Sequence, residues 1–253
     1  KLFYFILVSL LGLGNAYAVD AFVSTTGNDE NDGKSWAQAK ATIASAMTVS
    51  GITSGTIHVA AGTYNISSAI VFSKSFNIFG GYLVDDETGT ATRPLIPGGK
   101  PWEFEHETIL NAVLGVTGTN TDNKNSKIIH IGTGAYTLEI NGITFQNANG
   151  KHSSSNELGG AIGGSTPKTA GTQDITIRYC KFLNNGVTKK DYDYGGMGGA
   201  IWLKSKALID QCYFSGNYAD SGSGGGGAIF SQPNFAEELI TINSCMFDGN
   251  TSN

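Results

Sequence analysis

Three cysteines are the residues of this chain that could take the widest range of chemical roles. They are Cys180, Cys212 and Cys245, and each stands two places before a phenylalanine, as in "QCYFSGN" at 211–217. A cysteine can be a nucleophile, half of a disulfide, a metal ligand or a small apolar side chain. The choice depends on whether the surrounding stretch occurs once or repeats.

Acidic residues form a second candidate group, because an enzyme that cleaves polysaccharides needs paired carboxylates, or a calcium-binding acidic cluster beside a base. The adjacent acidic pairs are Asp85-Asp86 and Glu237-Glu238. Neighbouring side chains in a strand point to opposite faces, and in a loop they are usually solvated. Neither pair therefore predicts a catalytic site.

Metal sites are no better supported by the spacing of the ligands. The turn "GNDENDG" at 27–33 resembles a calcium loop, but Ala39 stands where an EF-hand needs its bidentate glutamate. The histidines, which have no cysteine at zinc-like spacing, are His58, His106, His130 and His152. We expect neither a metal nor a cofactor.

The chain has two arginines that could act as a catalytic base, Arg93 and Arg178. Arg93 lies in a segment that contains prolines. Arg178 aligns with Asn141, Asp210 and Asn243 in the repeats described next, which favours a solvent-facing polar row over a catalytic role.

A repeated motif surrounds the cysteines. The stretches that align are "LEINGITFQNA" (138–148), "ITIRYCKFLNN" (175–185), "ALIDQCYFSGN" (207–217) and "ITINSCMFDGN" (240–250). Their phenylalanines are Phe145, Phe182, Phe214 and Phe247, spaced 37, 32 and 33 residues apart. An isoleucine stands five places before each phenylalanine. In the last three repeats an asparagine stands three places after it, as Asn185, Asn217 and Asn250, whereas the first repeat has Ala148.

A second motif, "GGAI", follows each of the first three phenylalanine repeats. It occurs at 159–162, 198–201 and 226–229. Two motifs that recur in the same order at near-constant spacing indicate a solenoid.

The alternation of apolar residues predicts what kind of solenoid this is. In "ITIRYCKF" the alternation is that of a strand but slips by one residue between Ile177 and Cys180, so we expect a bend there. Each repeat has room for three short strands. One repeat cannot bury its own apolar face and must stack on its neighbours, which places equivalent residues roughly 4.8 Å apart in columns.

The columns predict an all-β chain folded as a parallel β-helix. Phenylalanine and isoleucine columns would fill its interior. Asparagine at the turn tolerates a left-handed backbone and can hydrogen-bond to its stacked neighbours. An antiparallel sandwich should show more frequent hairpin turns, and a leucine-rich repeat needs spaced leucines that are absent here.

The first half is predicted to start and cap this solenoid, with the capping region at about 19–50. Ser35 is a plausible N-cap for a helix that runs to Met47, with Trp36, Ala39 and Ile43 on one face. First strands are expected in 56–64 and 76–82, an insertion loop at 83–107, and further strands in 107–112 and 127–132.

Both ends of the chain carry expectations about its context. Residues 1–18 have a positive start, an apolar run and a small-x-small end at Ala16-Tyr17-Ala18, which predicts a signal peptide and an exported domain over 19–253. The chain stops at "FDGNTSN", directly after a repeat and without a cap. We expect further repeats or another domain after Asn253.

The loops between the two motifs should project from one side of the solenoid, where insertions often form a binding face. Tyr192, Tyr194 and Tyr218, with Asp191 and Asp193, could stack on sugars and accept hydrogen bonds from their hydroxyl groups. The alternative is that these residues form plain polar loops.

The "GGAI" and "FxxN" repeats resemble those of the polymorphic outer membrane proteins, known best from chlamydial surface proteins. The matching tetrapeptides are Gly159–Ile162, Gly198–Ile201, Gly226–Ile229, Phe182–Asn185, Phe214–Asn217 and Phe247–Asn250. The opening "VSTTGNDENDGKSWAQAKATIASA" with "IHVAAGTY" is similar to the start of pectate-lyase-like secreted β-helices. The resemblance implies a right-handed β-helix displayed at or beyond a bacterial outer membrane, with adhesion as its usual role. Membrane association would need a C-terminal region that this chain lacks.

Three functions fit these observations. The first is a secreted or surface-displayed adhesive or structural β-helix without catalysis, which would bind a host or neighbouring cell surface or a polysaccharide. The second is a polysaccharide lyase or hydrolase on the same scaffold, and the third is a passive spacer. A net charge of −5 argues against a non-specific nucleic-acid binder, which needs a basic face.

The repeats also answer the question about the cysteines. Cys180, Cys212 and Cys245 share a column with Ile143, and a column that accepts isoleucine is most simply an inward apolar one. A disulfide between stacked neighbours stays open on distance alone, because stacked Cα atoms lie within disulfide range. We predict buried free thiols.

Overall fold

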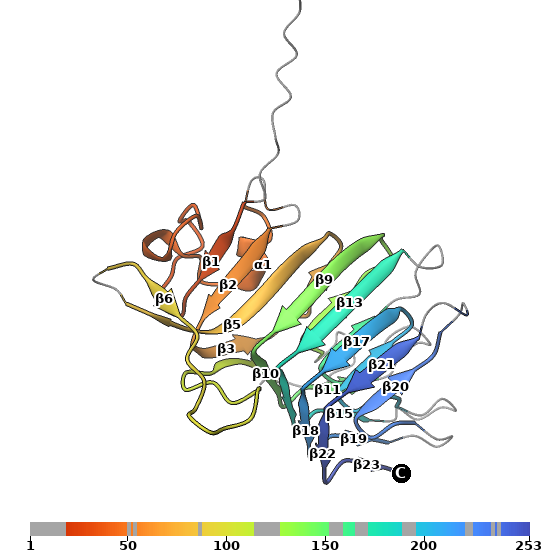
Figure 1. The fold of residues 1–253 in the computed structure, drawn as a ribbon. Coiled ribbons are helices and arrows are strands. Elements are labelled where there is room, and N and C mark those ends of the chain that lie inside the picture. The colour runs from red at the N-terminus through yellow and green to blue at the C-terminus, as the bar shows by residue number, and fades with distance from the viewer. Residues whose placement is uncertain are drawn as a thin grey trace, which may run out of the picture.

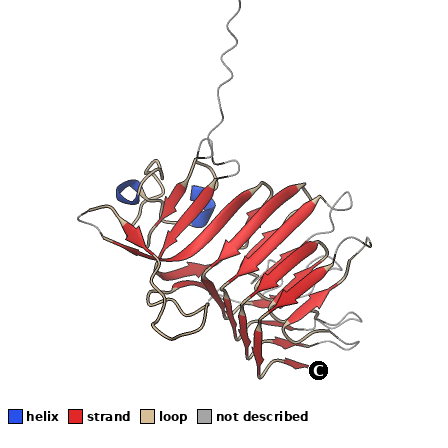
Figure 2. Ribbon diagram, viewed as in Figure 1, coloured by secondary structure: helices blue, strands red, loops and turns tan. Residues whose placement is uncertain are grey.

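The computed structural model is a parallel β-helix (Figures 1 and 2). It describes residues 19–49, 52, 55–85, 88–113, 127–151, 159–164, 172–188, 196–220, 225–233, 236 and 239–253. The expected signal peptide at 1–18 lies outside these residues. No helix in the described part of the chain is long and apolar enough to cross a membrane.

Four sheets of stacked parallel strands form the walls of the solenoid. The first sheet contains β1 (Ala21–Val23), β2 (Thr56–Ala60), β5 (Phe76–Val84), β9 (Tyr136–Asn141), β13 (Gln173–Arg178), β17 (Lys206–Asp210) and β21 (Ile240–Asn243). The second contains β3 (Gly62–Ile66), β7 (Thr108–Ala112), β10 (Ile143–Gln146), β14 (Lys181–Leu183), β18 (Tyr213–Ser215) and β22 (Met246–Asp248).

The two smaller sheets close the cross-section. The third contains β11 (Asn149–Lys151), β15 (Gly186–Thr188), β19 (Tyr218–Ala219) and β23 (Thr251–Ser252). The fourth contains β4 (Ile70–Phe72), β8 (Ile129–Ile131), β12 (Ile162–Gly164), β16 (Ile201–Leu203) and β20 (Ile229–Ser231). A complete coil such as β13 to β16 therefore has four strands, and the expectation of three is wrong. The "GGAI" segment begins a strand of its own, which the alternation around the phenylalanine did not reveal.

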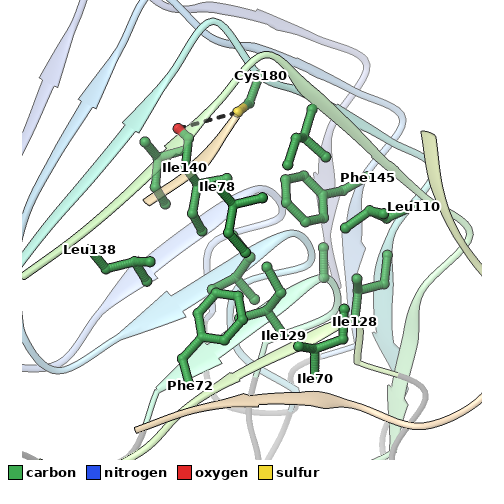
Figure 3. Close-up of a cluster of buried hydrophobic side chains, with 14 of the residues drawn as sticks. Ile70, Phe72, Ile78, Leu110, Ile128, Ile129, Leu138, Ile140, Phe145 and Cys180 are labelled. Atoms are coloured by element: carbon green, nitrogen blue, oxygen red, sulfur yellow. Dashed lines mark hydrogen bonds between the residues drawn. The ribbon is translucent and has the colours of Figure 1, made fainter. Parts of the chain in front are cut away.

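Identical residues stack in register from coil to coil. Phe182 pairs with Phe145 and Phe214, and Ile177 pairs with Ile140 and Ile209. The rings of Phe145, Phe182, Phe214 and Phe247 are stacked with centroids 5.0, 4.7 and 4.9 Å apart and nearly parallel planes. Together with Leu110 and Phe72 these columns fill the interior (Figure 3).

The chain turns between sheets through residues with a left-handed backbone. Tyr179, Gln211 and Ser244 have φ between 50° and 54° and join the first sheet to the second, at the bend predicted between Ile177 and Cys180. Gly142 takes the same place one coil earlier, with φ 69°. We call Gly142, Tyr179, Gln211 and Ser244 the corner column.

The asparagine column stands at the next bend. Asn185 donates from Nδ2 to Oδ1 of Asn217 at 3.0 Å, and Asn217 donates in the same way to Asn250 at 2.8 Å. The left-handed residue is the one before the column, for example Asn184 with φ 53°. The left-handed backbone that asparagine tolerates at a turn therefore falls one residue before the column asparagines. Their side chains point inward, where they donate to carbonyl groups such as that of Phe182.

The paired glycines allow the fourth sheet to stack closely. A Cβ placed on Gly160 would lie 1.9 Å from the carbonyl oxygen of Gly199 in the next coil, so only glycine fits. The alanine that follows, Ala161 or Ala200, is fully buried in the interior.

The N-terminal cap is shorter and less regular than a single helix from Ser35 to Met47. Ser35 does act as an N-cap, but for a 3₁₀ helix, Trp36–Gln38. The chain is then extended, and Lys40 pairs with β1, because β1 would otherwise have an unpaired edge. A second helix, α1 (Ile43–Ala46), begins after Thr42 and packs against β1, β2 and β4. Its residues Ile43 and Ala46 cover the first coil of the core.

Candidate functional site

The residues predicted for a binding face fall into two groups. Asp191, Tyr192, Asp193 and Tyr194 lie outside the described residues. Tyr218 lies in β19 and is half-buried, and a Cβ placed on Gly186 would come within 2.1 Å of its ring. Burial, and next the nearby Asp220 carboxylate, raise the pKa of Tyr218. The ring therefore packs in part against the neighbouring coil.

The cysteine column lies inside the solenoid. Cys180 and Cys212 are fully buried, Cys245 is partly exposed, and all three are free thiols. Each thiol donates to the carbonyl group two residues earlier; the sulfur–oxygen distance is 3.1 Å for Cys180 and 3.3 Å for the other two. A second contact reaches the carbonyl group of an isoleucine in the preceding coil, such as Ile140 (Figure 3). Burial raises the pKa of Cys212 well above its usual value, which disfavours the reactive thiolate.

The polar row at the ends of the first-sheet strands is more buried than predicted. Arg178 pairs in register with Asn141 and Asp210, and Asp210 pairs with Asn243, so the row exists. However, Asn141 and Asp210 are only 6% and 8% exposed, and the expectation of a solvent-facing row is wrong for these two. Asp210 is held between Arg178, whose Nε lies 3.4 Å from its Oδ2, and Asn243, whose Nδ2 donates to its Oδ1 at 2.7 Å.

Asn141 is covered by the insertion, which runs beside the corner column. The insertion first forms a hairpin, in which β6 (Ala91–Thr92) pairs antiparallel with the end of β5. Residues 93–104, which we call the arm, then turn along the solenoid; in Figure 1 they belong to the yellow-green loop below β3.

Arg93 anchors the first end of the arm. Its Nε donates to the carbonyl group of Gly80 at 2.7 Å and its Nη2 donates to Oδ1 of Asn141 at 2.6 Å. The guanidinium lies 5.0 to 5.3 Å from three ring centroids, those of Phe79, Tyr82 and Phe104. Desolvation lowers the pKa of Arg93, and the aromatic faces and hydrogen bonds offset the cost of burying its charge.

Trp102, in the turn of the arm between Ile96 and Glu103, anchors it two coils further along. Its ring is buried and stacks on that of Tyr213 in β18, with centroids 5.8 Å apart and planes 12° from parallel. Just beyond the arm, Glu107 accepts from Nζ of Lys181 at 2.5 Å and from the hydroxyl group of Thr144 at 3.1 Å. The arm is therefore fixed across several coils.

A groove of ≈ 640 Å³ lies between the arm and the corner column. Its inner wall is formed by Asn141, Tyr179 and Gln211, which come from three successive coils. Its outer wall is the arm, including Arg93, Leu95, Ile96 and Lys100. Because the coils succeed one another along the axis, the groove is parallel to the axis of the solenoid.

The groove offers side chains rather than backbone groups along its inner wall. The N–H groups of Gly142, Tyr179 and Gln211 donate to Arg178, Asp210 and Asn243 in the next coil. Gly142 has no room for a side chain, since a Cβ there would lie 2.4 Å from Nη2 of Arg93. The amide of Asn141 is engaged by Arg93 and Glu139, so the phenol of Tyr179 and the amide of Gln211 are the hydrogen-bonding groups that this wall offers.

A hydrogen-bonded trio near the groove was not predicted from the sequence. Nε2 of His58 is 3.1 Å from Oδ2 of Asp20, and Nδ1 of His58 is 2.8 Å from the hydroxyl group of Tyr82. Phe22 stacks on His58, and Trp36 packs edge-on against Phe22. The three polar residues are far apart in sequence and in no motif, so no signal could have found them. Their aromatic surroundings favour a structural role, holding the 3₁₀ helix against the first sheet.

The acidic turn at 27–33 serves as a structural turn. Asp29 accepts hydrogen bonds from the N–H groups of Ala41 and Thr42, both at 2.9 Å, and from the hydroxyl group of Thr42. Asp32 accepts from the N–H group of Lys34. Within the described ranges no group of three or more histidine, cysteine, aspartate or glutamate side chains could hold a metal ion.

Comparisons with protein families, with curated proteins and with solved structures found no match to the chain.

Proposed function

We propose that this chain is an exported, surface-acting binding protein in which the β-helix is the scaffold and the groove beside the corner column is the binding site. The observation that carries the proposal is the arm, which is anchored by Arg93 and by Trp102 and holds a groove of ≈ 640 Å³ against the outside of the solenoid. Ordered loops that frame a cavity on a rigid scaffold are common binding sites.

The context of the proposal comes from the ends of the chain and from the repeats. The signal peptide expected at 1–18 would export the protein, and the resemblance to polymorphic outer membrane protein repeats favours display at or beyond a bacterial outer membrane. Adhesion to a host or neighbouring cell surface, or to a polysaccharide, is the role that this placement supports.

Binding to intact cell surfaces tests the proposal. The processed chain, fluorescently labelled, is incubated with a panel of bacterial and eukaryotic cells, alongside the groove variant Tyr179→Gly/Gln211→Gly. Both positions have positive φ, so glycine removes the side chains without straining the backbone. The matched control is Ser244→Gly, in the same corner column but outside the groove.

The expected result is saturable binding by the wild-type chain and by Ser244→Gly, and at least tenfold weaker binding by the groove variant. Equal binding by all three proteins would place the binding surface elsewhere. Absence of binding to every surface tested would overturn the proposed function.

Cleavage of a polysaccharide is the second candidate, favoured by one observation. The ion pair of Arg178 and Asp210 directly precedes Tyr179 and Gln211 in the chain, so a carboxylate and a guanidinium lie beside the groove. Incubation with polyuronates and neutral polysaccharides, followed by assays for new reducing ends and unsaturated products, tests it. Turnover that Asp210→Asn abolishes would establish the second candidate in place of the first.

A further inference from the structure

We propose that the ligand of the groove is a linear polysaccharide, lying along the solenoid axis and contacted by Tyr179 and Gln211. This inference rests on the proposed function and names the chemical class of its ligand. Three features of the groove support it: its direction, the side chains of its wall and the hydrogen-bonded state of its backbone N–H groups.

The direction of the groove suits a linear polymer. Tyr179 and Gln211 stand at equivalent positions of two successive coils, and stacked residues in this solenoid are about 5 Å apart, as the phenylalanine centroids show. A sugar unit in an extended chain has a similar length. A polysaccharide along the axis could therefore repeat its contacts from one coil to the next.

The groups on the wall suit hydroxyl groups. An amide can both donate and accept hydrogen bonds, and so can a phenol, which matches the mixed character of a sugar hydroxyl. The half-exposed ring of Tyr179 also offers an apolar face against which the C–H face of a sugar can pack. Opposite this wall, Leu95, Ile96 and Pro97 give the arm an apolar side.

The backbone N–H groups of the wall are already hydrogen-bonded, which argues against an extended peptide as the ligand. A peptide that adds to a sheet needs a row of unpaired backbone N–H and C=O groups. Along the corner column the N–H groups of Gly142, Tyr179 and Gln211 already donate to the next coil. Recognition here depends on side chains, as in sugar binding.

The charges near the groove are compatible with both neutral and acidic sugars. The described lining residues include Arg93 and Lys100 but no carboxylate. The nearby carboxylates are engaged: Glu139 accepts from Asn141, Glu103 accepts from the N–H group of Lys100, and Asp210 pairs with Arg178. No acidic side chain on the wall would repel a uronate or a sulfated sugar.

Chemical treatment of the surface separates this inference from the proposed function. Cells that bind the processed chain are oxidised with periodate, which destroys vicinal diols of sugars, or digested with a broad-specificity protease. We expect binding to be lost after periodate and kept after protease. Binding that survives periodate and is lost after protease would leave the proposed function intact and overturn the polysaccharide.

Purified polymers supply the second measurement. Affinity electrophoresis with soluble neutral, uronate and sulfated polysaccharides compares the wild-type chain with Tyr179→Gly, Gln211→Gly and Ser244→Gly. We expect retardation by at least one class, weakened about tenfold by each of the first two variants, a factor that corresponds to about 1.4 kcal/mol, and unchanged by Ser244→Gly. No retardation by any class, or equal retardation of all four proteins, would overturn the inference. Thermal melting of each variant confirms that it is folded.

Discussion

Two neighbouring asparagines, Asn184 and Asn185, show how closely each position in a coil is specified. Asn184 has φ 53° and is exposed, so its left-handed backbone changes the direction of the chain while its side chain stays in solvent. Asn185 is fully buried, and its side chain accepts from the N–H group of Ala148 and donates to the carbonyl group of Phe145. The same residue type thus serves once for its tolerance of a left-handed backbone and once for its amide.

Replacing these two asparagines should change the free energy of unfolding by very different amounts. Asn185→Ala leaves buried backbone groups of Phe145 and Ala148 without their partners, and we expect a loss of about 2–4 kcal/mol in the free energy of unfolding. Asn184→Gly keeps the turn and should change that free energy by less than about 0.5 kcal/mol. Urea denaturation of both variants checks this. A larger loss for Asn184→Gly than for Asn185→Ala would contradict the assignment.

Asp29 should make stability depend on pH at the acidic end. Burial alone would raise the pKa of its carboxyl group, but the hydrogen bonds from Thr42 and Ala41 outweigh it and lower the pKa below the ordinary 3.8. Because the folded pKa is depressed, the stabilisation is present above the unfolded pKa, near pH 4, and is lost as the pH falls through the folded value.

The variant Asp29→Asn isolates this effect. We expect it to be less stable than the wild-type chain by about 1 kcal/mol at pH 7, since it cannot give the charged acceptor, and the difference should shrink below pH 4. Urea denaturation at a series of pH values measures it. A difference that stays constant from pH 7 to pH 3 would show that the charge of Asp29 plays no part.

Among the elements, the arm departs most from the repeat. It has no regular strand beyond the β6 hairpin, yet Arg93 and Trp102 hold it against coils that are two apart. The residues between these anchors, such as Leu95 and Ile96, are 48% and 45% exposed. Backbone hydrogen bonds, such as that from Ile96 to Glu103, fold the arm back on itself, and the two anchoring contacts hold it against the solenoid.

Loss of either anchor should free the arm without unfolding the solenoid. We expect Trp102→Ala and Arg93→Gln to raise the rate of proteolysis beside Leu95 and Ile96 about tenfold or more, because local opening exposes the chain to the protease. Their melting temperatures should fall by only a few degrees. Lys100→Gln, which alters the arm without touching an anchor, is the control. Equal proteolysis of all these proteins would contradict the anchoring roles.

For the whole molecule, the main consequence of the stacked coils is that each coil is stabilised chiefly by its two neighbours. The N-terminal coil is covered by α1, whose Ile43 and Ala46 are buried. In the last coil of this chain Phe247 and Met246 are 47% and 49% exposed, whereas Phe182 and Phe214 are fully buried. Identical positions in different coils should therefore contribute unequally to stability.

The phenylalanine column allows a direct test of this gradient. Phe182→Ala removes a ring stacked on both sides and should lower the free energy of unfolding by about 3–5 kcal/mol. Phe247→Ala removes a half-exposed ring with one stacked neighbour and should cost less than half as much. Chemical denaturation of the two variants compares them, and equal losses would argue against stability that depends on stacked neighbours.

The sequence by itself determined the solenoid and most of its columns. Stacking in parallel register places equivalent residues on top of one another, so a motif such as "F-x-x-N" repeats in the chain wherever it repeats in space. The bend after Ile177 could be predicted from a slip in the alternation. The strand that begins at the "GGAI" motif could not, since this segment is too short to show an alternation of its own.

Only the tertiary structure decided where the groove lies. The contacts that build it join residues far apart in sequence and outside any repeat, such as Arg93 with Asn141 and Trp102 with Tyr213. Such contacts form once, so no column of equivalent residues reveals them. The same holds for Asp20, His58 and Tyr82, which three different segments bring together. Periodic interactions leave a record in the sequence, whereas single long-range contacts depend on the folded positions of the coils.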